Sequence, residues 1–410
     1  MERKWMSGAL ILFFLVSILG LLMRYVVFAA SPFLPFNHIL HAHSHTALLG
    51  FGFLFLLGAF LFVVIEGRFN VRYFARLAGA YFIATLGMGI SFLYQSYGAI
   101  SITFSTIVMI LAYVMVFAFL KTYRKHASDR QNPLIRWSLY WFIISSLGIW
   151  VLGPTAAILS KSHHLYFLSI QFFLHFQFNG FFTFAALGLI LFAFGDYDTA
   201  GTASKSGLLL LNISLLLTYF LSVTFVHKDG LFFAFNSAGV ALQFVAYILL
   251  LKPTIKSIRS PYSGPVWVKW ILYAGIIFII TKVLVQGIVM IPSMAVLSYS
   301  IREFIIGYIH LILLGATTFT VAGILLKYNL IPRSKWTAIG WVGTLITFVI
   351  TEIIIFGHGI ATWQGVGNAL SFIKMIFYAT VPFPVFIGCI VYGSVAHYIS
   401  QQGGNEKVIS

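Results

Sequence analysis

NHILHAHSHTALLGFGFLFLLGAFLFVVI, residues 37–65, is the stretch that decides the fold. Its first nine residues hold His38, His41, His43 and His45, and the remainder carries no charged residue. A run of roughly 20 apolar residues is long enough to cross a bilayer as a helix. Because the uncharged part alone has this length, the segment predicts a transmembrane helix with imidazoles near one end.

The composition of the whole chain extends this interpretation. Of its 410 residues, 60% are hydrophobic and only 8% are charged, against about 25% charged in ordinary globular proteins. Such a chain is an integral membrane protein, whose partner is the lipid bilayer. The composition excludes a disordered protein and a nucleic-acid-binding protein. The single cysteine, Cys389, excludes a disulfide scaffold.

Twelve apolar segments are long enough to span a membrane. Transmembrane strands are about ten residues long and alternate in polarity, so these longer continuous segments predict helices. The expected fold is an all-α polytopic protein with a single transmembrane domain, residues 1–410. The expected spans are 5–30, 37–65, 73–95, 99–120, 135–158, 165–194, 206–226, 231–251, 267–291, 299–326, 336–357 and 369–398.

The basic residues give the orientation. With the N-terminus inside, the outer side holds only Lys161, Lys228 and Arg302 of the 25 Lys and Arg residues. Nearly all the others fall in inner loops, as the positive-inside rule requires. Both termini are therefore expected in the cytoplasm of a multi-pass protein of the cell (inner) membrane. The net charge of +16 is interpreted as this topology signal.

The twelve histidines outnumber the nine acidic residues, and only His126 and His397 fall on the inner side. His45, His175 and His310 lie at similar depths in every fourth helix, roughly 15 Å below the outer boundary at 1.5 Å per residue. Each is followed five residues later by a glycine, in H-T-A-L-L-G, H-F-Q-F-N-G and H-L-I-L-L-G. This pattern predicts three four-helix pseudo-repeats. On the second helix, spacing places His38, His41 and His45 on one face and His43 on another.

The same segments resemble a known family. Y-I-H-L-I-L-L-G-A, residues 308–316, is similar to the helix-ten pattern H-x-H-L-x-x-x-G-A of the nitric-oxide reductase large subunit, in the heme–copper oxidase superfamily. H-F-Q-F-N-G, residues 175–180, resembles its helix-six pattern H-x-x-x-E-G. H-A-H-S-H-T-A-L-L-G-F, residues 41–51, resembles the multi-helix heme- and copper-binding proteins of nitric-oxide response.

The resemblance implies a set of cofactors and ligands. It makes His45 and His310 the axial ligands of a low-spin heme b, and His175 a ligand of a second metal, copper or iron. Where the family has a pair of histidines at the outer end of helix seven, this chain has only His227. Further candidates are His164 and His41 as metal ligands, and Arg24 and Arg302 as partners of the heme propionates.

Two positions depart from the family pattern. Tyr308 stands where the family has a histidine ligand of the active-site heme, and Asn179 stands where nitric-oxide reductases have a carboxylate. We therefore expect that the low-spin heme site is kept and that the second site, where the family reduces its substrate, has lost some of its ligands. Lys282, with Gln286 one turn away, lies near mid-membrane and is interpreted as part of a buried pair or a proton path.

Three functions remain open on the sequence alone. The first is a heme b redox or electron-transfer protein linked to nitric oxide or oxygen, with an electron-donor protein on the outer face. It would be an oxidoreductase if it turns over a substrate. The second is heme or copper handling or transport without redox turnover. The third, a secondary transporter, is disfavoured because the chain shows no inverted repeat and no helix break near a carboxylate pair.

Overall fold

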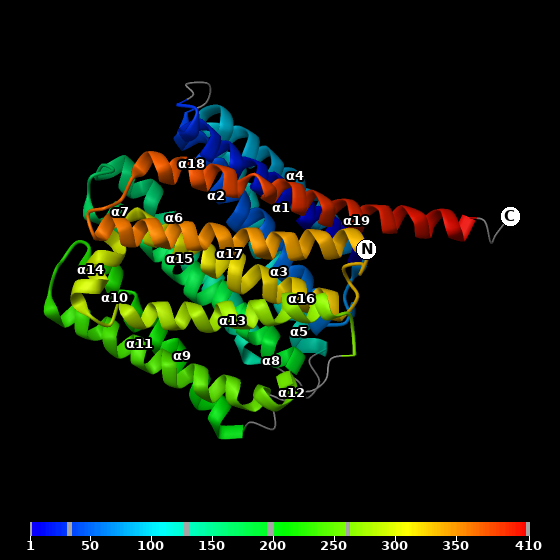
Figure 1. Ribbon diagram of the computed structural model, residues 1–410. Coiled ribbons are helices and arrows are strands. Elements are labelled where there is room, and N and C mark those ends of the chain that lie inside the picture. The colour runs from blue at the N-terminus through cyan, green and yellow to red at the C-terminus, as the bar shows by residue number, and fades with distance from the viewer. Residues whose placement is uncertain (1, 31–34, 127–131, 195–200, 260–262, 407–410) are drawn as a thin grey trace. The chain divides into compact units, whose positions relative to one another are not determined.

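The computed structural model describes residues 2–30, 35–126, 132–194, 201–259 and 263–406 (Figure 1). Every regular element in these ranges is a helix. Twelve stretches are long and apolar enough to cross a membrane, which confirms the predicted all-α fold and the number of spans. They are Lys4–Phe28, Phe36–Val64, Val71–Gln95, Ala99–Lys125, Pro133–Ile158, His164–Phe194, Ser204–Thr224, Gly230–Thr254, Val266–Ile288, Arg302–Lys327, Lys335–Trp363 and Ala369–Ala396.

Among the spans whose bounds differ from the sequence prediction, the tenth, the twelfth and the seventh also contain more than one helix. The tenth begins at Arg302 rather than at residue 299, because a separate short helix, α14 (Pro292–Ser300), ends at the extended residue Ile301. The twelfth consists of α18 (Ala369–Thr380) and α19 (Pro382–Glu406). Its interruption coincides with a proline, which has no backbone N–H to donate to the preceding turn. The seventh consists of α9 (Gly201–Thr218) and α10 (Phe220–Thr224).

The chain forms two compact units. Unit 1 contains Met1–His126, Gly264–Tyr273 and Val321–Ser410. Unit 2 contains Ala127–Ser263 and Ala274–Thr320. Helices α13 (Val266–Ile288) and α16 (Phe319–Lys327) each contribute residues to both units.

Unit 1 is a set of helices packed around the first two spans. Helix α1 packs against α2, α18 and α19, α4 packs against α2 and α5, and α17 packs against α19. Phe13 of α1 stacks on Phe51 of the second span with ring centroids 4.3 Å apart. Its elements not yet bounded are α1 (Glu2–Phe28), α2 (Phe36–His45), η1 (Thr46–Gly52), α3 (Phe53–Ala59), η2 (Phe60–Val64), α4 (Val71–Gln95), α5 (Ala99–His126) and α17 (Lys335–Trp363).

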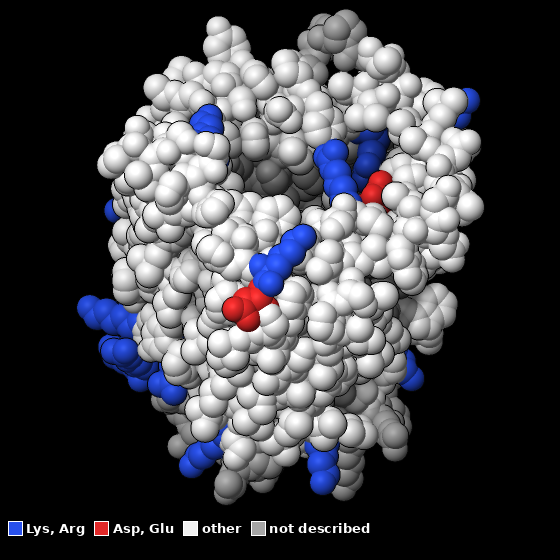
Figure 2. Space-filling model, turned by 90° about the vertical axis from the view of Figure 1, so that its left-hand side faces the viewer, with Lys and Arg blue, Asp and Glu red and all other residues white. Residues whose placement is uncertain are grey.

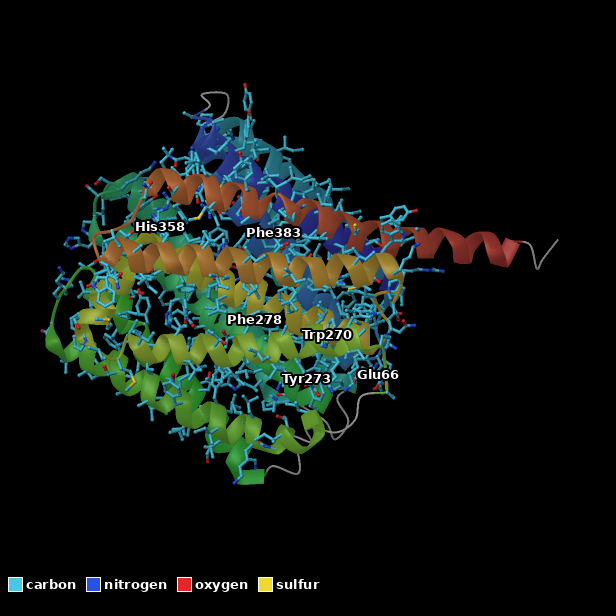
Figure 3. The ribbon with its side chains drawn as sticks, viewed as in Figure 1. Glu66, Trp270, Tyr273, Phe278, His358 and Phe383 are labelled. Atoms are coloured by element: carbon cyan, nitrogen blue, oxygen red, sulfur yellow. The ribbon has the colours of Figure 1, made fainter. Side chains whose placement is uncertain are left out.

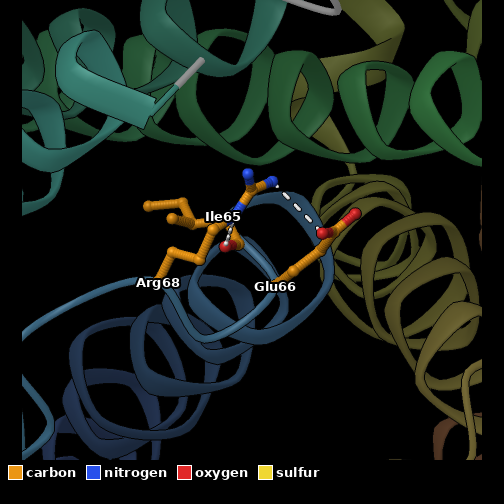
Figure 4. Close-up of polar contacts among 3 residues, drawn as sticks. All are labelled: Ile65, Glu66 and Arg68. Carbon is orange, nitrogen blue, oxygen red and sulfur yellow. Dashed lines mark hydrogen bonds and ion pairs between the residues drawn. The ribbon is translucent and has the colours of Figure 1, made fainter. Parts of the chain in front are cut away.

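A tight turn joins the second span to the third at the end predicted to be cytoplasmic. Glu66 and Gly67 have φ angles of +53° and +73°. Arg68 Nη2 lies 3.1 Å from Glu66 Oε2, and Arg68 Nε donates to the carbonyl of Ile65 at 3.3 Å (Figure 4). Both charged side chains are largely exposed, so the pair fixes the turn locally and adds little to stability.

Unit 2 is built around the sixth span. Helix α9 lies along α11, α6 packs on α7, η3 and α8, and η5 meets α8 and η3. Trp141 of α6 stacks on Phe176 at 5.1 Å, and its Nε1 donates to Asn212 of α9 at 2.9 Å. Its elements not yet bounded are α6 (Pro133–Ile158), α7 (His164–His175), η3 (Phe176–Phe182), α8 (Thr183–Phe194), α11 (Gly230–Leu251), η4 (Lys252–Thr254), α12 (Ile255–Arg259), α15 (Arg302–His310) and η5 (Leu311–Thr318).

Charged side chains are sparse on the face that Figure 2 shows. Figure 2 views the end at which α7 and α14 lie in Figure 1, and most of the visible surface is neither acidic nor basic. Along α13, Figure 3 labels Trp270, Tyr273 and Phe278. Trp270 is 56% exposed, whereas Phe278 packs against Phe319 with ring centroids 5.8 Å apart. One face of this helix thus presents a large aromatic ring outward and another face packs inside the protein.

The spans differ strongly in how far protein encloses them. All of the most apolar window of the second span is buried, as are 89% of that window in the sixth and 78% in the tenth. In each of the other nine spans half of it or less is buried. The three most enclosed spans are the three that carry His45, His175 and His310, so these histidines stand on the helices least exposed to lipid.

Candidate functional site

Each of the three histidines is followed directly by a π-helical segment. η1 begins after His45, η3 begins after His175, and η5 begins after His310. In each, the fifth residue is the glycine of the sequence pattern, Gly50, Gly180 or Gly315. A π turn holds an extra residue and re-aims the side chains beside it, and such turns are frequent at functional sites. The shared local geometry supports the predicted equivalence of helices two, six and ten.

In unit 1, three histidines of α2 face α4 and the turn after it. His38 Nδ1 lies 3.0 Å from the carbonyl oxygen of Leu93, and the ring of His41 lies 4.5 Å from that of Tyr97. His45 stacks on Phe92 with centroids 4.4 Å apart. These contacts confirm that His38, His41 and His45 share one face of the helix.

His45 is held by one polar contact in addition to this stacking. Its Nε2 lies 2.9 Å from the hydroxyl of Tyr97. Tyr97 follows Ser96, whose φ of +52° turns the chain sharply after α4. The turn therefore brings a phenol to the same imidazole nitrogen that commonly binds a metal.

His43 points to the opposite side of α2, toward α1. Its Nδ1 lies 3.0 Å from the carbonyl oxygen of Val16, and its ring rests against Gly20. A carbonyl can only accept, so Nδ1 carries the proton and Nε2 carries the lone pair. Metal-binding histidines characteristically donate their other ring nitrogen in this way. Helical spacing alone predicts this separate face for His43, but no role follows from the spacing.

In unit 2, His175 has a similar arrangement with the nitrogens exchanged. Its Nε2 donates to the carbonyl of Leu215 at 2.9 Å, and its ring packs edge-on against Tyr219 at 5.6 Å. Nδ1 therefore carries the lone pair. The hydroxyl of Tyr219 donates to the carbonyl of Leu168 at 3.1 Å, which fixes the ring beside His175.

The two residues that depart from the family pattern lie together. The hydroxyl of Tyr308 is 3.1 Å from Asn179 Oδ1 and 3.1 Å from Gln286 Oε1. The hydroxyl has one proton, so it donates to one of these oxygens at a time. Tyr308 is therefore bound as a neutral phenol to two amides. This bonding disfavours a tyrosinate that ligates heme iron.

Lys282 lies in α13, one turn before Gln286. Its side chain is 0% exposed, and its Nζ has no hydrogen-bond partner within the described residues. An uncompensated ammonium in an apolar interior is costly, so Lys282 is the most unusual ionisable group of unit 2.

The outer histidines form a separate group. The ring centroid of His164 is 6.0 Å from that of His227 and 6.3 Å from that of His163. His175 stands 11 residues further along α7, roughly 16 Å away at the rise of an α-helix. The structure thus brings His164 and His227 together but leaves His175 apart from them. Across the described ranges, no three His, Cys, Asp or Glu side chains form a group that could hold a metal ion.

The remaining predicted residues occupy the expected ends of their helices. Arg24 is half-buried near the end of α1, Arg302 is exposed at the start of α15, and His310 is half-buried at the end of α15. His358, labelled in Figure 3, stacks on Phe372 at 4.0 Å. The inner histidines His126 and His397 lie outside the residues whose side chains are described.

These imidazoles suit heme iron or copper, the groups that the sequence resemblance implies. Imidazole is a usual axial ligand of heme iron and of copper. His43 and His175 each have one ring nitrogen fixed by a backbone carbonyl, so the lone pair stands on the other nitrogen. The oxidase-like set of several histidines around a second metal is not assembled within unit 2.

Comparison with known proteins gives the fold. No family model matches the chain, and no curated protein matches it. Among solved structures, the chain is similar to a heme–copper terminal oxidase determined as a dimer by cryo-electron microscopy, with a TM-score of 0.69 at 10% sequence identity. The match covers 96% of this chain and 84% of that one. The expected heme–copper oxidase fold is therefore confirmed.

Proposed function

We propose that this chain, a membrane protein with the heme–copper oxidase fold, is a heme b-binding redox protein of the cell (inner) membrane. The observation that carries the proposal is the placement of His45, His175 and His310, each directly before a π segment, in the three most enclosed spans. A heme b would supply reversible one-electron chemistry near the outer face. An electron-donor protein on that face, and a link to nitric oxide or oxygen, belong to the same proposal.

The axial ligands follow from the resemblance and from hydrogen bonding. The resemblance assigns His45 of helix two and His310 of helix ten to one low-spin heme. The bond from His43 to Val16 makes His43 a competing ligand on helix two, because its Nε2 carries the lone pair. The half-buried Arg24 and the exposed Arg302 are the proposed partners of the propionates.

The residues around the proposed second metal support a site with fewer ligands than the family has. His175 is the proposed ligand of copper or iron through Nδ1, since Leu215 takes its Nε2 proton. The place of a second heme ligand is taken by Tyr308, which is bonded to amides. His164 and His227 form a separate outer pair rather than additional ligands beside His175, and His41 lies on the Tyr97 side of α2. We infer electron transfer, or chemistry at one metal, rather than the reaction of a full terminal oxidase.

An absorption experiment tests the proposal. Purified protein should show a reduced-minus-oxidised spectrum of a low-spin bis-histidine heme b. The bands should be lost in His310→Ala and kept in His358→Ala, which alters a histidine stacked on Phe372. A colourless protein after expression with added heme would refute the proposal.

A second function, heme or copper handling without redox turnover, is favoured by the Tyr308–Asn179 bond, because this bond occupies the place of oxidase chemistry. The two functions differ in what happens to the heme. A redox protein keeps its heme while oxygen or nitric oxide reoxidises it. A handling protein transfers heme to an apo-globin without prior reduction.

A further inference from the structure

We propose that unit 2 contains a binding site for a small monovalent inorganic anion, formed by Lys282, Gln286, Asn179 and Tyr308. The proposal goes beyond the heme function, because none of these residues is an assigned heme or metal ligand here. It rests on a buried lysine whose Nζ has no hydrogen-bond partner within the described part of the chain, and on the two amides of the same unit that carry N–H donors.

The first observation is Lys282 itself. Its side chain is fully buried and its Nζ lacks a hydrogen-bond partner within the described residues. An ammonium group offers three donors and no acceptor. Inside a protein such a charge is normally paired. The one Asp or Glu of unit 2 within the membrane spans is Glu303, which lies in the first turn of the tenth span, so the deeper part of the unit offers no carboxylate as a counter-ion.

The second observation is the neighbouring amides. Gln286 lies four residues after Lys282 on α13, so both side chains project from the same face of the helix. The oxygens of Gln286 and Asn179 lie at the hydroxyl of Tyr308. Each amide also carries two N–H donors, which point away from the oxygen that lies at Tyr308. The cluster therefore combines one lysine with two amides that carry N–H donors.

The third observation is a further unpartnered donor in the same unit. The hydroxyl of Tyr247 is also buried and unpartnered in the described structure. Unit 2 thus holds a buried ammonium and a buried phenol that have no acceptor among the described residues. A small anion would satisfy them through charge-assisted hydrogen bonds, which are among the strongest in proteins.

Azide is a suitable probe, because its infrared stretch shifts when the ion leaves water for a protein interior. The wild-type protein in nanodiscs is titrated with azide and followed by infrared and by visible absorption. We expect a bound-azide band that saturates while the heme absorption does not change. Lys282→Met should weaken azide by about tenfold or more, the size expected for losing a charged hydrogen bond.

Lys374→Met is the matched control, because Lys374 is an exposed lysine of another span. It should bind azide as the wild type does. If Lys282→Met cannot be purified, Gln286→Met takes its place and should also weaken azide. The inference is overturned by a wild type without a bound-azide band, by equal affinity in the cluster variant, or by azide that shifts the heme absorption. A colourless protein that still binds azide through Lys282 would contradict only the heme proposal.

Discussion

The hydroxyl of Tyr308 on helix ten lies 3.1 Å from the amide oxygen of Asn179 on helix six. The residues stand 129 positions apart in the chain, and each is a position at which the sequence departs from the nitric-oxide reductase pattern that it resembles. Their direct bond means that the two departures form one arrangement. A phenol and an amide complement each other as donor and acceptor, so the two side chains satisfy one another without a metal.

Tyr308→Phe tests the role of this hydroxyl. The change removes the bonds to Asn179 and Gln286 and leaves the ring in place. We expect a loss of about 1–3 kcal/mol, the cost of leaving buried amide oxygens unsatisfied, seen as a lower thermal midpoint of the purified protein. The heme spectrum should not change. Loss of a heme band in this variant would show that Tyr308 is a ligand.

His43→Ala and His45→Ala separate the two candidate ligands of helix two. Whichever imidazole binds the iron, its removal should abolish the low-spin spectrum, because a lone helix-ten ligand leaves the iron open on one side. The other variant should keep the spectrum. Both variants are measured by reduced-minus-oxidised absorption at equal protein concentration, with His358→Ala as the reference. Low-spin spectra in both alanine variants would rule out an axial ligand from this pair.

Tyr97→Phe provides an independent test of His45. If His45 binds iron through Nε2, the hydroxyl of Tyr97 competes for that nitrogen, so removing it should raise heme occupancy. If His43 is the ligand, the same change costs only about 1 kcal/mol of hydrogen bonding and leaves occupancy unchanged. A pyridine hemochrome assay gives the heme-to-protein ratio that decides between these outcomes. A fall in occupancy would contradict both assignments.

Gly148→Ala tests the packing of α6 on α7. A Cβ at Gly148 would lie 2.9 Å from the backbone nitrogen of Phe173 and 3.2 Å from its Cβ. Backbone cannot move aside as a flexible side chain can, so we expect a loss of about 1–3 kcal/mol from overpacking. The measurement is the thermal midpoint. Gly153→Ala in the same helix meets nothing within 4 Å, and should be neutral or slightly stabilising because alanine favours a helix.

The number of membrane spans and the shared helix face of His38, His41 and His45 could be predicted because each depends on the local sequence pattern. Apolar length alone identifies a span, and the spacing of His38, His41 and His45 alone places them on one face. The π segments could not be predicted, since an extra residue in a turn leaves no mark in composition. The bond between Tyr308 and Asn179 joins two helices that are distant in sequence, so only their packing shows it.

His43 shows a different limit of the sequence. Its orientation away from that shared face followed from spacing, but its partner, the carbonyl of Val16, belongs to another helix. Every residue has a backbone carbonyl, so the sequence of α1 does not identify Val16 as the residue whose carbonyl accepts the hydrogen bond. The sequence places Lys282 too deep in the membrane for an ordinary surface lysine. That its Nζ has no hydrogen-bond partner among the described residues follows only from the positions of the neighbouring side chains.

The complete enclosure of the second span has a consequence for biogenesis. This span has the highest mean hydropathy of the twelve, 2.6, although none of its most apolar window remains exposed in the folded chain. A segment that ends up surrounded by protein has no lasting need to suit lipid. Its high hydropathy therefore matters during membrane insertion, when the newly made helix lies in the bilayer before its neighbouring helices have packed around it.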